Sequence, residues 1–171
     1  FSIFKTENSA TKSELPLITV ITPYYNNSML ENAVKSVLMQ NYPSIEYIIA
    51  DDHSTHSPMG AIKRLIMEYG HNNCREVVLL RQNTNVGTVK NLNDALRISK
   101  GKYIFFLAAD DMFFDADVLS GWTHEFTQTG ALVITALRLV CKEHFGNIEC
   151  IRPTRKQIHK IRTLSPKLLY S

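Results

Sequence analysis

Residues 17–52, LITVITPYYNNSMLENAVKSVLMQNYPSIEYIIADD, decide the fold because they alternate the pattern of a buried strand with that of a helix. Residues 17–23 are short, apolar and β-branched, which is typical of a strand covered on both faces. Residues 28–40 place apolar side chains on one helical face, and residues 45–50 return to the pattern of a buried strand. A strand, a helix and a second strand in this order predict a parallel βαβ unit.

A few residues predict where these elements begin and end. Pro23 is expected to stop the first strand, because proline has no N–H to give to a ladder. Ser28 and Glu31 have the spacing of a capping box and predict the start of the first helix. Gly101 is expected to close a later helix, since glycine is the usual residue just after a helix end.

The alternation continues to about residue 140 and predicts one α/β domain. Further strands are expected at residues 76–81, 102–108 and 131–141, and further helices at residues 58–69, 88–99 and 115–128. Consecutive β-α units favour a doubly wound, mostly parallel sheet with helices on both faces. In such sheets, ligands bind outside the carboxyl ends of the strands.

The composition excludes several other classes of protein. Of the 171 residues, 44% are hydrophobic and 20% are charged, which fits a globular domain rather than a disordered chain. No apolar run reaches the roughly 18–20 residues that a membrane helix needs. Cys74, Cys141 and Cys150 are odd in number and lack C-x-x-C spacing, which argues against a disulfide framework or a zinc site and favours a cytoplasmic protein.

The two ends of the chain are expected to lie outside the central domain. Residues 1–16 lack the basic start and the long apolar block of a signal peptide, and are expected to be a leader. Residues 152–171 carry six Lys or Arg side chains and no acid, whereas residues 1–151 carry all 16 acids and 13 of the 19 Lys and Arg. This basic tail fits a solvated surface or peripheral contact with an anionic membrane, and no nucleic-acid partner is expected.

Polar and aromatic residues gather where four successive strands end, at residues 23–26, 51–54, 81–87 and 110–111. Because the carboxyl ends of parallel strands share one edge of a sheet, these clusters predict one binding site. Gly87 and Lys90 begin the following helix in a way that suits a diphosphate, although a lone lysine there is more often a solvated helix residue. The sequence contains no G-x-G-x-x-G or G-x-x-x-x-G-K-[ST], which disfavours dinucleotide oxidoreductases and Walker ATPases.

Asp110 and Asp111 are unusual because carboxylates seldom end a buried strand without partners. Adjacent side chains on extended backbone point in opposite directions, so the two cannot clamp one ion symmetrically. One suits a divalent cation such as Mg²⁺ or Mn²⁺, and the other suits a hydroxyl-bearing ligand. The alternative is that both belong, with Asp115, to a turn and helix cap.

Asp51 and Asp52 raise the same question at the second strand. A carboxylate there suits the N–H of a nucleobase, and Tyr24 and Tyr25 offer faces on which a base stacks. The alternative is that Asp52 caps a turn and that the tyrosines are half-buried strand-end residues.

Taken in order, these clusters resemble the donor-binding half of the inverting nucleotide-diphosphosugar glycosyltransferases of family 2. The matching blocks are ITVITPYYN, SVLMQNY, IIADDHSTH, NVGTVKNLNDALRISKGKYI and FFLAADD, within about residues 17–115. The resemblance implies a GT-A, Rossmann-like α/β fold and transfer of a sugar, with inversion, to an acceptor hydroxyl. It also implies a UDP-sugar donor, a sugar or lipid-linked acceptor, and a role in cell-surface polysaccharide or glycolipid synthesis.

The resemblance implies roles for residues on the base side of the site. Pro23 and Tyr25 are expected to line the base, with Tyr25 stacking on it. Asp52 is expected to accept the ring N–H of uracil, and Asp51 to shape the same loop. His53 stands where the family has glycine, which is a departure in the turn after the acidic pair.

Other implied roles lie on the diphosphate side. Asp110 is expected to contact the ribose or the sugar, and Asp111 to bind Mn²⁺ or Mg²⁺. Lys90 is expected to contact the diphosphate, since the family's usual arginine is Leu92 here. Ala108 replaces the first aspartate of the family's D-x-D-D, which leaves Asp111 as the metal ligand.

The catalytic residue is unknown, because an inverting transfer needs a carboxylate base and no residue matches the family's. The last three acids, Glu125, Glu143 and Glu149, stand in no matching motif. Residues 17–141 are expected to form the nucleotide-sugar-binding domain, with residues 142–171 as a basic tail or the start of an absent acceptor-binding half. The alternative function is a non-catalytic nucleotide-sugar-binding module or an inactive fragment.

Overall fold

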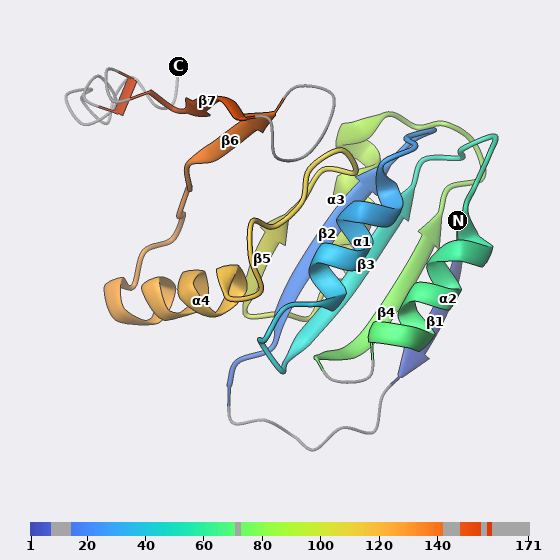
Figure 1. Cartoon of the computed structure of the whole chain (residues 1–171). Coiled ribbons are helices and arrows are strands. Elements are labelled where there is room, and N and C mark those ends of the chain that lie inside the picture. The colour runs from blue at the N-terminus through green and yellow to red at the C-terminus, as the bar shows by residue number, and fades with distance from the viewer. Residues whose placement is uncertain (8–14, 71–72, 142–147, 155–156, 159–171) are drawn as a thin grey trace. The chain divides into compact units, whose positions relative to one another are not determined.

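In the computed structural model the chain divides into two compact units, residues 1–130 and residues 131–171. The structure describes residues 1–7, 15–70, 73–141, 148–154 and 157–158. The first unit holds a five-stranded sheet and the second a two-stranded sheet (Figure 1). No helix among the described residues is long and apolar enough to cross a bilayer.

The sheet of the first unit is mostly parallel and doubly wound, which confirms the expected fold class. Its strands are β1 (Ser2–Glu7), β2 (Ile18–Tyr24), β3 (Ile45–Asp51), β4 (Cys74–Arg81) and β5 (Tyr103–Phe106). They are ordered β1-β4-β3-β2-β5, with β1 antiparallel to β4 and the other pairs parallel. From β2 the chain adds β3 and β4 on one side and then β5 on the other, so the winding reverses between β2 and β5.

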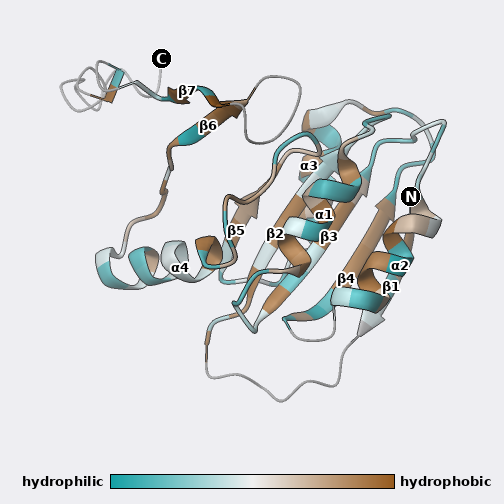
Figure 2. Cartoon of the chain, in the orientation of Figure 1, coloured by the Kyte–Doolittle hydropathy of each residue, from teal (hydrophilic) through white to brown (hydrophobic). Residues whose placement is uncertain are grey.

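Helices cover both faces of this sheet because the buried strands are apolar on both faces (Figure 2). The helices are α1 (Leu30–Leu38), α2 (Met59–Tyr69), α3 (Thr88–Ile98) and α4 (Val118–Thr129). Ala95 of α3 packs with Ile21, Ile48 and Val78 on one face. Figure 1 shows α1 and α2 side by side on the other face.

Helix α4 packs on β5 through aromatic side chains. The ring of Phe126 stacks on Tyr103 with centroids 4.7 Å apart, and Phe105 lies 5.5 Å from Trp122. Ile104, which alternates with these residues along β5, packs instead against the cluster beneath α3. Alternate side chains of a strand point to opposite faces, so α4 and α3 lie on opposite sides of the sheet.

Pro23 does not end its strand, contrary to the expectation. Strand β2 continues to Tyr24, and Pro23 pairs with Ala50 of β3. The Ile21 carbonyl accepts a hydrogen bond from Leu107, so Ile21 and Pro23 both turn their backbone groups toward β5. The ladder between β2 and β5 stops at Ile21, so the missing N–H of Pro23 costs no hydrogen bond.

The predicted capping box at Ser28 and Glu31 is also wrong. Helix α1 begins at Leu30, and its cap residue Met29 makes no side-chain capping bond. The Asn27 side chain accepts the N–H of Met29 at 2.8 Å instead. An Asx turn therefore starts the helix, because Asn27 can bond its own backbone two residues on.

Gly101 serves close packing rather than a helix cap. Helix α3 ends at Ile98 with Ser99 as its cap residue in an extended conformation. A Cβ on Gly101 would lie 2.4 Å from the backbone nitrogen of Thr19. The Gly101 N–H also donates to the Thr19 hydroxyl at 2.9 Å, so the chain crosses β2 here too closely for any side chain.

Two expectations at the ends of the domain differ from the structure. Ser2–Glu7, expected within a leader, form β1 because the edge of β4 offers them a ladder of backbone partners. In the second unit, only β6 (Arg138–Cys141) of the strand expected at residues 131–141 is formed. It pairs antiparallel with β7 (Ile148–Arg152), not with the main sheet, and Leu132 is 96% exposed. An apolar run predicts a strand but not its partner.

The domain boundaries otherwise stay predictions. The first compact unit ends at Gly130, which occupies the left-handed conformation after α4. Most of the basic tail, residues 155–156 and 159–171, lies outside the described residues, as does Glu143.

Two glycine substitutions test this packing. We expect Gly101→Ala to lower the free energy of unfolding by about 2–3 kcal/mol, because its methyl group meets the backbone of β2. Gly121→Ala is the matched control, since nothing lies within 4 Å of its added methyl inside α4, and it should raise stability by about 0.5–1 kcal/mol. Urea denaturation measures both; equal effects would contradict the assigned role of Gly101.

Candidate functional site

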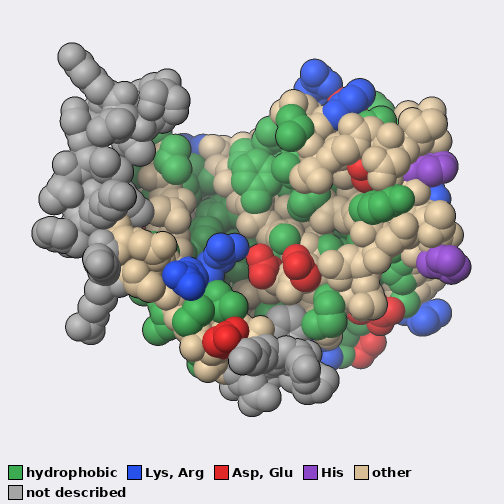
Figure 3. All heavy atoms as spheres, turned by 90° about the horizontal axis from the view of Figure 1, so that it is seen from above, with side chains coloured by type: hydrophobic (Ala, Val, Ile, Leu, Met, Phe, Trp, Pro, Cys, Tyr) green, Lys and Arg blue, Asp and Glu red, His purple; other side chains and the backbone are tan. Residues whose placement is uncertain are grey.

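The carboxyl ends of the parallel strands form one edge of the sheet, on which acidic side chains lie exposed near the middle (Figure 3). The loops after β2 and β5 flank the point where the winding reverses. Pro23 and Tyr25 lie at the end of β2, and the Tyr25 side chain is 51% exposed. Asp110 and Asp111 follow β5 and are exposed. The residues expected on the base side and on the diphosphate side therefore flank the switch point, where doubly wound sheets bind ligands.

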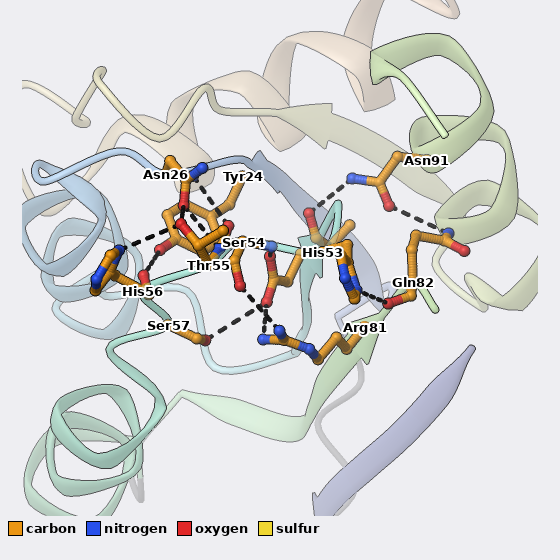
Figure 4. Close-up of polar contacts among 12 residues, drawn as sticks. Tyr24, Asn26, His53, Ser54, Thr55, His56, Ser57, Arg81, Gln82 and Asn91 are labelled. Atoms are coloured by element: carbon orange, nitrogen blue, oxygen red, sulfur yellow. Dashed lines mark hydrogen bonds and ion pairs between the residues drawn. The ribbon is translucent and has the colours of Figure 1, made fainter. Parts of the chain in front are cut away.

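Asp51 holds loops together at this edge, because both oxygens of its buried carboxylate accept bonds from the protein. It forms an ion pair of 2.7 Å with Arg81 and accepts the N–H of Ser54 at 2.8 Å. The Ser57 hydroxyl lies 3.4 Å away, and Arg81 also donates to the carbonyl of Ser54 at 2.9 Å (Figure 4). These bonds hold the loop after β3 against the end of β4, consistent with the loop-shaping role expected of Asp51.

Asp52 joins the loop after β3 to the loop before α3. Its two carboxylate oxygens accept the N–H groups of Val86 at 2.7 Å and Gly87 at 2.9 Å, and its side chain is buried. Its own N–H donates to the Tyr24 carbonyl at 2.9 Å. Each carboxylate oxygen has two lone pairs, so these bonds leave acceptor capacity for a base N–H. The expected contact with uracil stays a prediction.

Two turn residues at this edge adopt left-handed backbone conformations. Asn26 has φ 46° and His53 has φ 65°, in the region that favours glycine. Asn26 links the loops, because its side-chain oxygen accepts the N–H of Thr55 at 2.9 Å. A ring nitrogen of His53 lies 3.3 Å from the Gln82 carbonyl. The turn needs a residue that tolerates positive φ. This need explains why the family that the chain resembles has glycine at the position of His53.

Gln82 and Asn91 are buried polar neighbours of the acidic pair at β3 that the sequence patterns do not identify. The Gln82 amide donates to Asn91 at 3.3 Å and to Asp94 at 3.1 Å. Asn91 donates in turn to the Ala50 carbonyl at 2.7 Å, directly before the acidic pair (Figure 4). The sequence does contain one signal for this contact. Asn91 lies on the same face of the helix as Ala95, and a polar residue at such a core position implies a buried hydrogen-bond partner.

Lys90 is tied to its own helix rather than directed freely at a ligand. Its ammonium lies 2.7 Å from the carboxylate of Asp94, which also pairs with Arg97 at 2.6 Å. The hydrogen bond from Lys90 is the largest cause that lowers the pKa of Asp94, while burial opposes it. A pocket of about 500 Å³ borders this helix and is lined by Val86, Gly87, Thr88, Val89, Lys90, Asn93 and Arg97.

The loop that carries the acidic pair is irregular. The N–H of Asp111 donates to the Ala108 carbonyl at 3.0 Å, which closes a turn around Asp110. The turn-and-cap alternative holds for Asp115, whose carboxylate accepts the N–H of Asp117 at 2.9 Å before α4. Asp117 is the cap residue of α4 and makes no side-chain capping bond.

The donor set at this edge suits one kind of metal ion. No group of three or more His, Cys, Asp or Glu side chains within the described ranges is arranged to hold a metal. At this edge, Asp110 and Asp111 would supply one or two carboxylate ligands to a metal ion. Such a set fits Mg²⁺ or Mn²⁺, which take their remaining ligands from water and substrate phosphates, and does not fit a structural zinc ion.

The sequence matches the family model described as glycosyl transferase family 2 over residues 19–168. It is 38% identical over 98 residues to a Bacillus subtilis protein named as a glycosyltransferase of teichuronic acid biosynthesis. It is 33% identical over 98 residues to an Escherichia coli UDP-Glc:alpha-D-GlcNAc-diphosphoundecaprenol beta-1,3-glucosyltransferase. These regions cover 56% and 57% of this chain but 36% of each relative.

Solved structures show the same fold at low sequence identity. A mannosyltransferase from Pyrobaculum calidifontis, in complex with GDP-Man and Mn²⁺, superimposes with a TM-score of 0.60 and 21% identity over 80% of this chain and 38% of that one. S. aureus TarS in complex with UDP-GlcNAc gives a TM-score of 0.57 and 21% identity over 74% of this chain and 34% of that one. The fold is therefore the GT-A glycosyltransferase fold.

The backbone at His53 provides one test. We expect His53→Gly to keep stability or raise it by up to about 1 kcal/mol, because glycine adopts positive φ without a steric penalty. His53→Val should lower stability by about 1–2 kcal/mol, since a β-branched side chain is strained there. Urea denaturation at neutral pH separates the two variants; indistinguishable midpoints would contradict the left-handed turn.

Asp94 provides a test by pH. Because its pKa is lowered in the folded state, the stabilisation it gives is present above the unfolded value of about 4 and is lost as the pH falls through the folded value. We therefore expect Asp94→Asn to be less stable than the wild type at pH 7, with the difference shrinking below about pH 4. Chemical denaturation across this range measures it, and a difference independent of pH would contradict the charge-based role.

Proposed function

The chain belongs to glycosyl transferase family 2, and we propose that it forms the donor-binding part of an enzyme that transfers a sugar from a nucleotide-diphosphosugar to an acceptor hydroxyl. The observation that carries this proposal is the exposed acidic pair, Asp110 and Asp111, at the switch point of the sheet, with the exposed Tyr25 on the loop after the neighbouring strand β2. A nucleotide lying across this point has an aromatic face at one end and carboxylates at the other.

The base lies at the β2 and β3 loops in this proposal. Tyr25 is exposed enough to stack on a base, and Pro23 precedes it at the end of the strand. Asp52 accepts the ring N–H of the base with a remaining lone pair while it holds Val86 and Gly87. Uracil presents one ring N–H to such an acceptor, which is consistent with a UDP-sugar as the proposed donor.

The diphosphate lies near the acidic pair. Asp111 binds Mn²⁺ or Mg²⁺, and Asp110 accepts hydrogen bonds from the ribose or the sugar. The metal ion supplies charge neutralisation of the leaving diphosphate when it is bound. Lys90 is a further candidate for the diphosphate, because its ammonium has three donors and its bond to Asp94 uses one.

The acceptor chemistry is proposed to lie outside this chain. Transfer with inversion requires a base to take the acceptor's proton, and Glu125 lies exposed on α4 without a matching motif. The matched regions cover about a third of the longer relatives, so the base and the acceptor site are expected in the parts that this chain does not match. A lipid-linked acceptor, as in the name of one relative, and a role in cell-surface polysaccharide synthesis fit this division.

Localisation follows as a proposal of the same kind. A sugar donor and a lipid-linked acceptor meet at a membrane surface, so we place the protein in the cytoplasm with peripheral contact to the inner face. The six basic residues of 152–171 supply charge for such contact with anionic lipid. No role for a nucleic acid is proposed.

A second candidate is a nucleotide-sugar-binding module without catalysis. The lack of a matching base among the described residues favours it, and binding alone needs no base. Transfer of sugar from a UDP-sugar by the full-length protein would exclude this candidate, whereas donor binding without transfer or hydrolysis would support it.

The donor site is tested by UDP titration of the chain with and without Mn²⁺ in a calorimeter. We expect Mn²⁺ to strengthen UDP binding in the wild type, and Asp111→Ala to reduce that gain by at least about tenfold, because it removes the metal ligand. Asp115→Asn is the matched control, since it removes a charge from the same loop while keeping the oxygen that accepts from Asp117. Absence of UDP binding, or an unchanged gain in Asp111→Ala, would overturn the proposal.

A further inference from the structure

The block SVLMQNY, residues 36–42, has no part in donor binding as proposed, yet it is one of the blocks that carry the family resemblance. It covers the end of α1 and the turn that follows. Ser36 and Gln40 are buried, although apolar side chains would suit those positions on a helix packed against a sheet. Their polar groups must have partners, and the partners lie about 75 residues further along the chain.

Gln40 binds the segment before α4 with both ends of its amide. The nitrogen donates to the carbonyl of Asp115 at 2.6 Å and to that of Ser36 at 3.1 Å. The oxygen accepts the N–H of Leu119 at 3.1 Å, in the first turn of α4. A single buried side chain therefore satisfies backbone groups on both sides of the start of α4, including one N–H that the helix itself cannot bond.

Ser36 and Asn41 extend this contact in both directions. The Ser36 hydroxyl accepts the N–H of Phe113 at 3.2 Å and donates to the Ala33 carbonyl at 2.8 Å. The backbone N–H of Asn41 donates to the Ala116 carbonyl at 2.8 Å. The segment from Phe113 to the first turn of α4 is thus fixed along α1 by bonds to its backbone.

These bonds form one of two anchors for the acidic pair. At the other anchor, the Leu107 N–H donates to the Ile21 carbonyl of β2 at 3.0 Å. Asp110 and Asp111 lie in the irregular stretch between Leu107 and Phe113, outside any helix or strand. Their positions therefore depend on where the two anchors hold the chain.

We propose that Gln40 and Ser36 are positioning residues for Asp110 and Asp111, acting through the backbone of residues 113–119. The proposal rests on the proposed function, in which Asp111 binds a divalent cation together with the donor diphosphate. Metal ligands need placement within a few tenths of an ångström, and the groups that orient them are worth about 10- to 100-fold in metal affinity. Gln40 provides a donor and an acceptor at fixed separation, which neither glutamate nor methionine does.

The test compares variants of Gln40 and Ser36 with a variant of another buried polar side chain elsewhere in the domain. Gln40→Met removes the three hydrogen bonds of the amide at similar volume, and Ser36→Ala removes the bond to Phe113 together with the bond to Ala33 within α1. Thr19→Val is the matched control, because the buried Thr19 hydroxyl bonds Glu46 and Gly101 at the opposite end of the sheet. UDP affinity is measured by calorimetry with and without Mn²⁺ on the 171-residue chain, at a temperature where each variant is folded by circular dichroism.

We expect both anchor variants to bind UDP without metal as the wild type does. The Mn²⁺-dependent gain should fall by about 10- to 100-fold in Gln40→Met and by less in Ser36→Ala, while Thr19→Val keeps the gain. Gln40→Glu keeps the acceptor for Leu119 but sets a buried carboxylate against the carbonyls of Asp115 and Ser36, so it should lose at least as much of the gain as Gln40→Met. Ser36→Ala is the second variant if Gln40→Met does not fold.

Several outcomes would overturn the inference. A full Mn²⁺ gain in the folded Gln40 variants would show that the anchor does not position the acidic pair. An equal loss in Thr19→Val would show that lower stability alone explains the effect. A wild-type chain in which Mn²⁺ gives no gain would instead overturn the proposed function, so the two failures are distinguishable.

Discussion

The carboxyl end of β3 is the constraint on which the rest of the site depends, because two adjacent buried carboxylates there bond groups from other loops. Asp51 faces Arg81 and the loop after β3, whereas Asp52 faces the N–H groups of Val86 and Gly87. A buried carboxylate is stable only when its oxygens are bonded. The loops after β3 and β4 and the start of α3 are therefore fixed by the same two residues.

The two acidic pairs have the same sequence and opposite environments. Asp51 and Asp52 are buried and engaged by the protein, while Asp110 and Asp111 are exposed at the neighbouring switch point. One pair holds the loops at this edge of the sheet, and the other is the pair proposed to contact the metal ion and the donor. Burial distinguishes the two pairs. The burial of a carboxylate depends on which residues of α3 and β4 pack against it, and the local sequence does not contain that information.

The sequence predicted the features that depend on periodic apolar side chains and missed those that depend on pairing between distant segments. The parallel sheet and its helices were predicted, and the strand-end clusters were brought to one edge as expected. Pro23 reads as a strand end in sequence, because only its position relative to β5 shows that its missing N–H costs no hydrogen bond. The bonds of Gln82 with Asn91, and of Gln40 with Leu119, join residues whose partners no local pattern identifies. The assigned ligand contacts stay predictions for the same reason.

The direction of β1 has a consequence for experiments on this protein. Ser2 pairs with Arg81, so the antiparallel first strand begins at the edge of the sheet where the site loops lie. A polypeptide or fluorophore joined ahead of Phe1 would emerge beside that edge rather than at the far end of the domain. The start of β1 is therefore a suitable attachment point for a distance reporter of ligand entry, and a poor place for a bulky fusion partner.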